Sequence, residues 1–539
     1  MKKQAMVVCA QPEAAESGIE ILRAGGNAVD AAVATALAQT VVDPLMCGIA
    51  GFGTAAVYMP GNGVHEYIDF HSPAPLGAKE DMWEHLLEGE TQDGFGFILK
   101  GRVNDIGPQS IGVPATLKGL EVMHQAHGRL PWHQVVEPAI RWAQDGFFVR
   151  PGMHAFWIDE PKMGRAGNLE RLQYCEVAKQ LYCREDGRPK AIGTPLSNPD
   201  MARVLERIAR EGSQPFYHGD MAQQMVAHLQ SLGALLTLDD FAQYDVTRNA
   251  PLVGRYRDRV ITTNQPPGGG AMVLQMLKFL EQFDLSSMEH NSPEYLQVVC
   301  EVMKKATIDK DRYLGDPKFF DVPLEYLLSS QLAQEVAQHI RAGEKFHVER
   351  FNPGAPVPKD TTHLSVVDGD GNAVSLTHSL AMPSGVITPG MGFYYNGCMG
   401  VFDPRPGRAG SIQPGKCRFT ASSPTMTFKD GQLDVVLGSP GGTQIAMGVL
   451  HVLLNVIDHG MEIQQAVSAP RFSSTSNAID VCNRIPRYTT KVLEEQGYRI
   501  GRNPFNYTIG WVHAVQVTPE GLRGGADPGR DGVAYRTWL

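Results

Sequence analysis

A polar segment over residues 344–360 divides the 539-residue chain into two parts with different residue patterns. The segment contains Pro353, Pro356 and Pro358 and has no helical or strand periodicity, which is typical of a linker. Before it, apolar residues recur at helix-like spacing, and after it they alternate with polar residues between tight turns. A chain with this division must combine a large helical portion with antiparallel sheets.

The part before the linker begins with a helix that we expect to be buried on all sides. Asn27 follows two glycines and can cap the helix over 28–42, which is apolar nearly all round. A hairpin is expected over 55–70, with its turn at 60–63. Residues 115–345 are expected to be mainly helical, with helices over 119–127, 136–144, 201–211, 221–232, 272–283 and 293–311.

The part after the linker predicts hairpins separated by helices. An Asp-Gly-Asp-Gly turn joins two expected strands over 361–368 and 372–380. Two further hairpins are expected over 424–437 and 513–527, and an apolar helix over 443–459. This order predicts an α+β fold in which stacked sheets are covered by helices on both sides.

Composition excludes several classes of protein. The chain has 48 basic and 58 acidic residues, and this net charge of −10 argues against a nucleic-acid binder held by phosphate contacts. No apolar stretch approaches about 18 residues, so we expect no membrane span. The first ten residues lack the apolar run of a signal peptide, and the eight cysteines show no zinc spacing. We therefore expect a cytoplasmic protein with reduced thiols.

Several common site motifs are missing from the sequence. It has no G-x-x-x-x-G-K-[ST] loop, no H-E-x-x-H and no G-x-S-x-G. The glycine-rich stretch at 265–270 lacks the strand and helix context of a dinucleotide site. The sequence therefore offers no signal for a nucleotide or a metal.

Two segments could instead carry chemistry. Thr361 begins a strand directly after the linker, so a cut in front of it would place its hydroxyl beside a free α-amino group. That amine has a pKa of about 8 and can act as a general base. The glycines at 438–442 precede a helix and can direct backbone N–H groups at an oxyanion. On spacing alone, an ordinary strand start and a tight turn remain the alternatives.

These segments also carry a specific resemblance. Residues 361–374, which read T-T-H-L-S-V-V-D-G-D-G-N-A-V, resemble the start of the small subunit in the γ-glutamyltransferase family. Other segments that match the family in order are 25–33, 112–114, 137–139, 216–219, 313–317, 438–442 and 469–472. The resemblance therefore covers essentially the whole chain.

The resemblance implies an N-terminal-nucleophile hydrolase with a four-layer αββα sandwich. Such a chain is made as a precursor that cuts itself, here between Asp360 and Thr361. The products would be a large chain, 1–360, and a small chain, 361–539, which together form one intertwined globular unit.

The resemblance also implies roles for individual residues. Thr361 would attack an amide carbonyl with its own α-amino group relaying the proton, and the N–H groups of Gly441 and Gly442 would hold the oxyanion. Ser379 stands where the family usually has threonine and would orient the nucleophile. Neither a metal nor an organic cofactor is implied.

The substrate-binding positions depart from the family pattern. The Asp-Phe-Arg segment that holds the γ-glutamyl carboxylate ends here in His71, a single pH-dependent donor instead of a bidentate arginine. Other polar positions of the family are occupied here by Ala381, Cys398, Val401, Thr420 and Ala421. Together these changes would leave a glutamyl ammonium and carboxylate poorly paired, at a cost of several kcal/mol.

The leading hypothesis is an amide hydrolase that does not prefer γ-glutamyl compounds, similar to the acylase-like and oxamate-amidohydrolase-like branches of the family. His71, Thr420 and Arg418 would bind a small acyl amide, either carboxylate-bearing or neutral. One alternative is a true γ-glutamyltransferase or glutathione hydrolase. Another is a pseudoenzyme that binds a small ligand without cleaving it, although the intact nucleophile motif weighs against this alternative. The expected partners are a small-molecule amide and the two chains of one precursor. We expect no nucleic acid and no membrane, and the sequence leaves homo-oligomer formation open.

Overall fold

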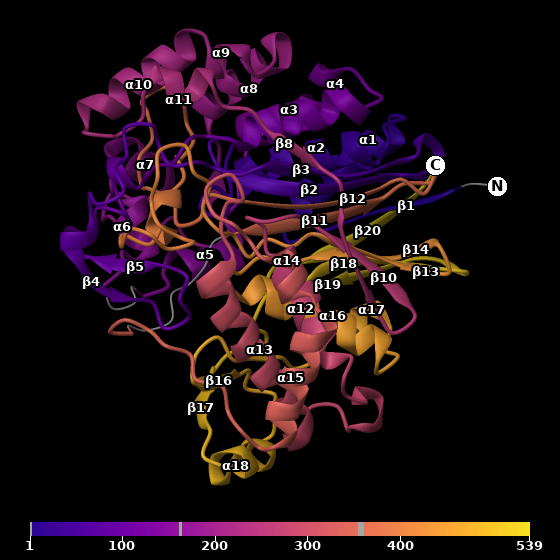
Figure 1. Ribbon diagram of the computed structural model, residues 1–539. Helices are drawn as coiled ribbons and strands as arrows, with labels where there is room; N and C mark the ends of the chain where they lie inside the picture. The colour runs from indigo at the N-terminus through magenta and orange to yellow at the C-terminus, as the bar shows by residue number, and fades with distance from the viewer. Residues whose placement is uncertain (1–2, 161–163, 354–360) are drawn as a thin grey trace.

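Two antiparallel sheets stack face to face at the centre of the molecule, and helices cover both outer faces (Figure 1). The computed structural model describes residues 3–160, 164–353 and 361–539. Asp360, on the amino side of the predicted cleavage point, lies outside the described residues. Among the described residues, no helix is both long and apolar enough to cross a membrane.

The first sheet has seven strands in the order β20-β1-β11-β12-β2-β3-β8. Its strands are β1 (Gln4–Cys9), β2 (Phe52–Met59), β3 (Val64–Phe70), β8 (Thr247–Asn249), β11 (Thr362–Val367), β12 (Ala373–Ser379) and β20 (Val533–Trp538). The two hairpins expected over 55–70 and 361–380 are confirmed, and they pair with each other through β12 and β2. In the β11–β12 turn, the Asp368 carboxylate accepts hydrogen bonds from the N–H groups of Asp370 and Asn372.

The second sheet has six strands in the order β19-β18-β14-β13-β10-β9. Its strands are β9 (Leu252–Tyr256), β10 (Arg259–Thr263), β13 (Thr425–Lys429), β14 (Gln432–Gly438), β18 (His513–Thr518) and β19 (Gly521–Ala526). The sheets touch closely, because Ser375 Oγ of the first donates to the Leu437 carbonyl of the second at 2.9 Å. Gly438 permits this approach, since a Cβ there would lie 2.3 Å from the His363 ring.

Helices cover the first sheet on its outer face. The covering helices are α1 (Pro12–Arg23), α2 (Ala28–Val42), α3 (Thr116–His127) and α4 (Trp132–Asp145). As expected, every residue of α2 is buried, and Asn27 forms a capping box with Asp30. More helices lie beyond and beside them: α5 (Pro151–Trp157), α6 (Asn168–Leu172), α7 (Glu176–Tyr182), α8 (Pro199–Glu211), α9 (Gln214–Tyr217), α10 (Asp220–Ser231) and α11 (Leu238–Ala242).

A second helical layer covers the other sheet. It contains α12 (Gly270–Leu280), α13 (Pro293–Tyr313), α14 (Leu324–Leu327), α15 (Ser330–Arg341), α16 (Gln444–Ile457) and α17 (Ile463–Ser468). Apolar clusters fill the space between the sheets and the space under each helical layer. The predicted four-layer αββα sandwich is therefore confirmed.

Small elements complete the fold. These are α18 (Arg487–Glu495), β4 (Leu87–Glu90), β5 (Phe97–Leu99), β6 (Phe147–Phe148), β7 (Pro195–Leu196), β15 (Phe472–Ser473), β16 (Ala478–Val481) and β17 (Arg499–Arg502). The sequence did not predict β1, β20 or the strands β8, β9 and β10 inside the mainly helical region. Strands β8–β10 are three to five residues long and mostly only partly buried, so their alternation is weak.

Candidate active site

Four neighbouring strands of the first sheet end at the same border. The register pairs nearest this border are Thr362 with His378, Ser379 with Phe52, and Gly53 with Phe70. Continued by one residue, the register places Thr361, Ser379, Phe52 and His71 side by side across β11, β12, β2 and β3. We call these four residues the terminal row. Since neighbouring strands lie about 4.8 Å apart, the row spans roughly 14 Å.

The predicted nucleophile lies at one end of the terminal row. Thr361 is 8% exposed, and its Oγ1 donates a hydrogen bond to Ser379 Oγ over 3.1 Å. Ser379 Oγ also accepts a hydrogen bond from the N–H of Ala381 at 2.8 Å. Ala381 has φ = 60°, a left-handed conformation that costs a non-glycine residue on the order of 1 kcal/mol. This strained turn fixes the Ser379 hydroxyl beside the Thr361 hydroxyl.

The glycine segment lies beside the same end of the row. β14 ends at Gly438, and α16 begins at Gln444. Between them, Gly441 and Gly442 have φ values of 126° and 57°, which other residues rarely adopt. Pro440 lines the same small pocket as Thr361. The structure therefore brings the predicted nucleophile to one pocket with Pro440, the residue before the two glycines that lead into a 14-residue helix.

A buried polar network that the sequence analysis missed borders this pocket. Gln39 Nε2 donates to Gln11 Oε1 at 2.7 Å and to Thr362 Oγ1 at 3.1 Å. Gln11 Nε2 in turn donates to Asp43 Oδ2 at 2.8 Å. Burial raises the pKa of the Asp43 carboxyl, while Arg150 and Gln11 oppose the rise. In the sequence, Asp43 directly follows the apolar helix expected over 28–42, and no motif marks it as part of a site.

His71 lies at the other end of the terminal row. It is 7% exposed, and neither ring nitrogen has a hydrogen-bond partner among the described residues. Burial lowers the pKa of His71, although nearby Asp69 opposes this shift. The ring borders a pocket of about 600 Å³ that is also lined by Asp69, Tyr244 and Asp316. A neutral His71 offers this pocket one donor and one acceptor.

Arg418 lies over the middle of the terminal row. Its guanidinium carbon is 4.4 Å from the centre of the Phe52 ring and 5.7 Å from that of Phe95. Nη1 donates to the Phe419 carbonyl at 3.1 Å, whereas buried Nε has no hydrogen-bond partner among the described residues. Burial raises the pKa of the adjacent Cys398 thiol, and Arg418 opposes the rise.

The other predicted substrate-binding residue is engaged locally. Thr420 is buried, and its hydroxyl donates to Ser422 Oγ at 3.0 Å and accepts from the Ser422 N–H at 3.2 Å. The hydroxyl thus holds its own turn, two residues from Arg418. Within the described ranges, no group of three or more His, Cys, Asp or Glu side chains is arranged to hold a metal ion.

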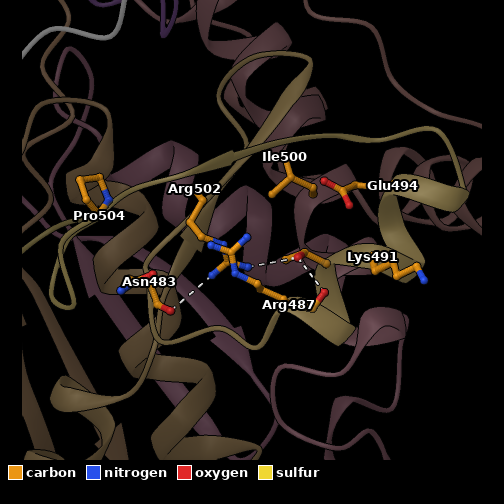
Figure 2. Close-up of a pocket in the computed structure, with 8 residues that line it drawn as sticks. Asn483, Arg487, Lys491, Glu494, Ile500, Arg502 and Pro504 are labelled. Atoms are coloured by element: carbon orange, nitrogen blue, oxygen red, sulfur yellow. Dashed lines mark hydrogen bonds between the residues drawn. The ribbon is translucent and has the colours of Figure 1, made fainter.

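A separate hollow lies between α18 and β17, at the bottom of Figure 1. Its volume is about 590 Å³, and Arg487, Lys491 and Arg502 line it (Figure 2). Arg502 is held by the backbone carbonyls of Asn483 and Ile485. Because no predicted site residue lines this hollow, we assign it no part in the chemistry.

The chain is similar to known proteins over nearly its whole length. The family model described as gamma-glutamyltranspeptidase matches residues 14–537. The acylase ACY 1 proenzyme of Pseudomonas sp. (strain V22) is 34% identical over 526 residues, covering 97% of this chain and 91% of that protein. The glutathione hydrolase proenzyme of Escherichia coli (strain K12) is 32% identical over 545 residues, covering 98% and 90%.

Solved structures agree with these sequence matches. The cephalosporin acylase from Bacillus halodurans has a TM-score of 0.87 and 28% identity, covering 99% of this chain and 96% of that one. The gamma-glutamyltranspeptidase of Helicobacter pylori has a TM-score of 0.56 and 29% identity, covering 63% of this chain and 92% of that one.

Proposed function

The chain belongs to the gamma-glutamyltranspeptidase family, and from this premise we propose that it is a self-processing amide hydrolase with Thr361 as its nucleophile. The observation that carries the proposal is the contact of Thr361 Oγ1 with Ser379 Oγ, next to the glycine segment. We propose that the precursor is cut between Asp360 and Thr361 into a large chain, 1–360, and a small chain, 361–539.

The strand order supports the proposal that both chains stay together after the cut. In the first sheet, β11 pairs with β1 and β12 pairs with β2, so strands of the small chain lie between strands of the large chain. In the second sheet, β13 of the small chain pairs with β10 of the large chain. The two products would therefore share both sheets and their apolar cores.

The proposed cut frees the catalytic base. Thr361 Oγ1 attacks the carbonyl carbon of residue 360, the peptide becomes an ester, and water hydrolyses that ester. The α-amino group of Thr361 is then free, and its pKa of about 8 allows it to accept the hydroxyl proton at neutral pH. Ser379 holds the Thr361 hydroxyl in place throughout.

The same groups would carry out amide hydrolysis. The α-amino group takes the Thr361 hydroxyl proton as Oγ1 attacks the amide carbonyl, and the N–H groups of Gly441 and Gly442 stabilise the oxyanion. The proton passes to the departing amine, which leaves an acyl ester on Thr361. Water then attacks the ester, releases the acid and restores the enzyme.

The proposed substrate is a small amide that is not γ-glutamyl. Ala381 and Val401 offer no polar side chain, and the Cys398 thiol is buried with a raised pKa. His71, whose pKa is lowered by burial, is a single donor and cannot replace a bidentate arginine as a carboxylate partner. We propose that Arg418, Thr420 and His71 instead border a smaller acyl pocket. The competing candidate, a glutathione hydrolase, is favoured by the name of the Escherichia coli relative.

Two measurements test this proposal. Intact mass and N-terminal sequencing of the purified protein should find a fragment that begins at Thr361, and Thr361→Ala should prevent its formation. A single uncut wild-type chain would contradict the mechanism. Hydrolysis assays should then show a higher kcat/KM for small acyl amides than for a γ-glutamyl anilide, and the reverse order would favour the glutathione hydrolase.

A further inference from the structure

Arg418 differs from the other buried arginines because it has no carboxylate partner among the described residues. Among the described residues, five arginines are buried. Four of them lie against a carboxylate: Arg150 with Glu13, Arg165 and Arg171 with Asp105, and Arg471 with Asp527. Arg418 is 4% exposed and has no carboxylate within 4.0 Å among the described residues. A buried charge without a counter-ion costs several kcal/mol, so binding of an anion beside this guanidinium would be favourable.

The guanidinium is held in place without that partner. It stacks on Phe52, lies near Phe95 and donates one hydrogen bond to the Phe419 carbonyl. These contacts set the plane of the fork, while Nε has no hydrogen-bond partner among the described residues. A planar guanidinium held in place with an unused Nε–H suits a carboxylate, which can accept two parallel hydrogen bonds from an arginine.

The strand spacing in the terminal row gives an estimate of the distance between the Arg418 guanidinium and Thr361. Along the row, Phe52 lies two strand spacings from Thr361, or about 10 Å, and the Arg418 guanidinium stacks on the Phe52 ring. Both an attacked carbonyl and a bound carboxylate approach their partners to about 3 Å. About 4 Å remain, which suits an acyl group of no more than about four carbons.

We propose that Arg418 binds the free carboxylate of a short dicarboxylic acid monoamide and thereby sets the charge and the length of the acyl group. The inference rests on the proposed function, because Thr361 must attack the amide at the other end of the same molecule. The reaction consumes one monoamide and one water and yields the dicarboxylate and ammonia, with the acyl group held on Thr361 in between. No oxidant or other co-substrate enters.

The test uses the processed wild-type protein and a series of amides. The charged series is oxamate, malonamate, succinamate and glutaramate, and propionamide and butyramide serve as neutral amides of matching length. We expect kcat/KM to be highest within the two- to four-carbon charged amides and about tenfold lower for glutaramate and for the neutral amides. Equal values for charged and neutral amides would overturn the assignment of Arg418.

Variants separate recognition from catalysis. Arg418→Met should lower kcat/KM for the best charged amide by about 100-fold and kcat/KM for the neutral amides by much less. Arg418→Lys should recover part of the loss, because lysine keeps the charge without the fork. Arg487→Met, at the exposed hollow of Figure 2, is the matched control and should change neither series. An equal loss on both series in Arg418→Met would show a merely structural role.

A binding measurement keeps the two proposals distinguishable. If Thr361 is a free N-terminus and no amide is cleaved, the proposed function fails while Arg418 can still be tested. Calorimetry with malonate and succinate should then show binding to the wild type and none to Arg418→Met, provided that the variant is folded and processed. Absence of binding to the wild type would overturn the assignment of Arg418 on its own.

Discussion

The two ends of the terminal row differ in how their polar groups are satisfied. At the nucleophile end, the hydroxyls of Thr361 and Ser379 and the N–H of Ala381 are hydrogen-bonded to one another. At the other end, both ring nitrogens of His71 and the Nε of Arg418 are buried without a hydrogen-bond partner among the described residues. Asp43 Oδ1, beside the Thr361 pocket, also has no hydrogen-bond partner among the described residues. Because such groups are costly to bury, we propose that the Thr361 hydroxyl contacts form a preassembled catalytic end and that a ligand completes a recognition end at His71 and Arg418.

Removal of the proposed nucleophile, Thr361, should have the largest effect. Thr361→Ala takes away both the attacking hydroxyl and the reaction that frees its amine, so we expect no cleavage and a loss of activity of about 10⁴-fold or more. Mass spectrometry and an amide hydrolysis assay measure the two effects. Thr361→Ser keeps a hydroxyl and should still be cut, and an active, cleaved Thr361→Ala would contradict the account.

Distortion of the glycine segment should come next. At φ = 126°, Gly441→Ala is strained and displaces the N–H groups beside Thr361, so we expect kcat to fall about 100-fold with a smaller change in KM. Gly431→Ala is a matched control, since Gly431 has φ = 78° in the β13–β14 turn, with open space around it. Equal kcat values in the two variants would remove the glycine segment from the catalytic end.

Loss of the orienting hydroxyl should have a smaller effect. Ser379→Ala removes the acceptor of the Thr361 hydroxyl, and we expect kcat to fall about tenfold while KM changes little. Ser379→Thr restores a hydroxyl and should keep most of the activity. If Ser379→Ala raised KM and left kcat unchanged, Ser379 would belong to the recognition end.

The smallest predicted effect concerns stability and pH. Burial lowers the pKa of His378 to about 3, and its Nε2 contacts Gln39 Oε1 at 2.8 Å behind the nucleophile. Its folded-state pKa lies below the unfolded value of about 6.5, so the stability that it contributes is present above pH 6.5 and is lost as the pH falls.

Denaturant unfolding at pH 7 and pH 5 tests this prediction. From pH 7 to pH 5, the free energy of unfolding of the wild type should fall by about 2 kcal/mol more than that of His378→Gln. The reason is that the unfolded wild type takes up a proton at His378 that the folded protein does not, and the variant lacks this histidine. The same loss in both proteins would show that His378 takes up its proton in the folded state.

The sequence predicted the secondary structure around Thr361 well. The Asp-Gly-Asp-Gly turn and its flanking alternation identify the hairpin that begins at Thr361, and the glycine segment precedes an apolar helix as expected. Both signals are local, since each lies within about twenty residues and depends on turn chemistry and periodicity. The resemblance then supplied the order of the four layers, which no local pattern determines.

The arrangement of Phe52, His71 and Arg418 could not be predicted from the sequence. The terminal row depends on the register of four strands, and Phe52 became part of it only through its pairing with Ser379. Arg418 was proposed as a binding residue, but the absence of a counter-ion is a property of the folded surroundings. The network of Gln11, Gln39 and Asp43 was missed for the same reason, because it joins side chains from separate elements.

A crystal structure of the processed enzyme with succinate bound would test the central claim most directly. The account predicts one carboxylate within hydrogen-bonding distance of Arg418 and the other beside Thr361 and the N–H groups of Gly441 and Gly442. Succinate bound elsewhere, or Arg418 paired with a carboxylate of the protein itself, would contradict the division of the terminal row into a catalytic and a recognition end.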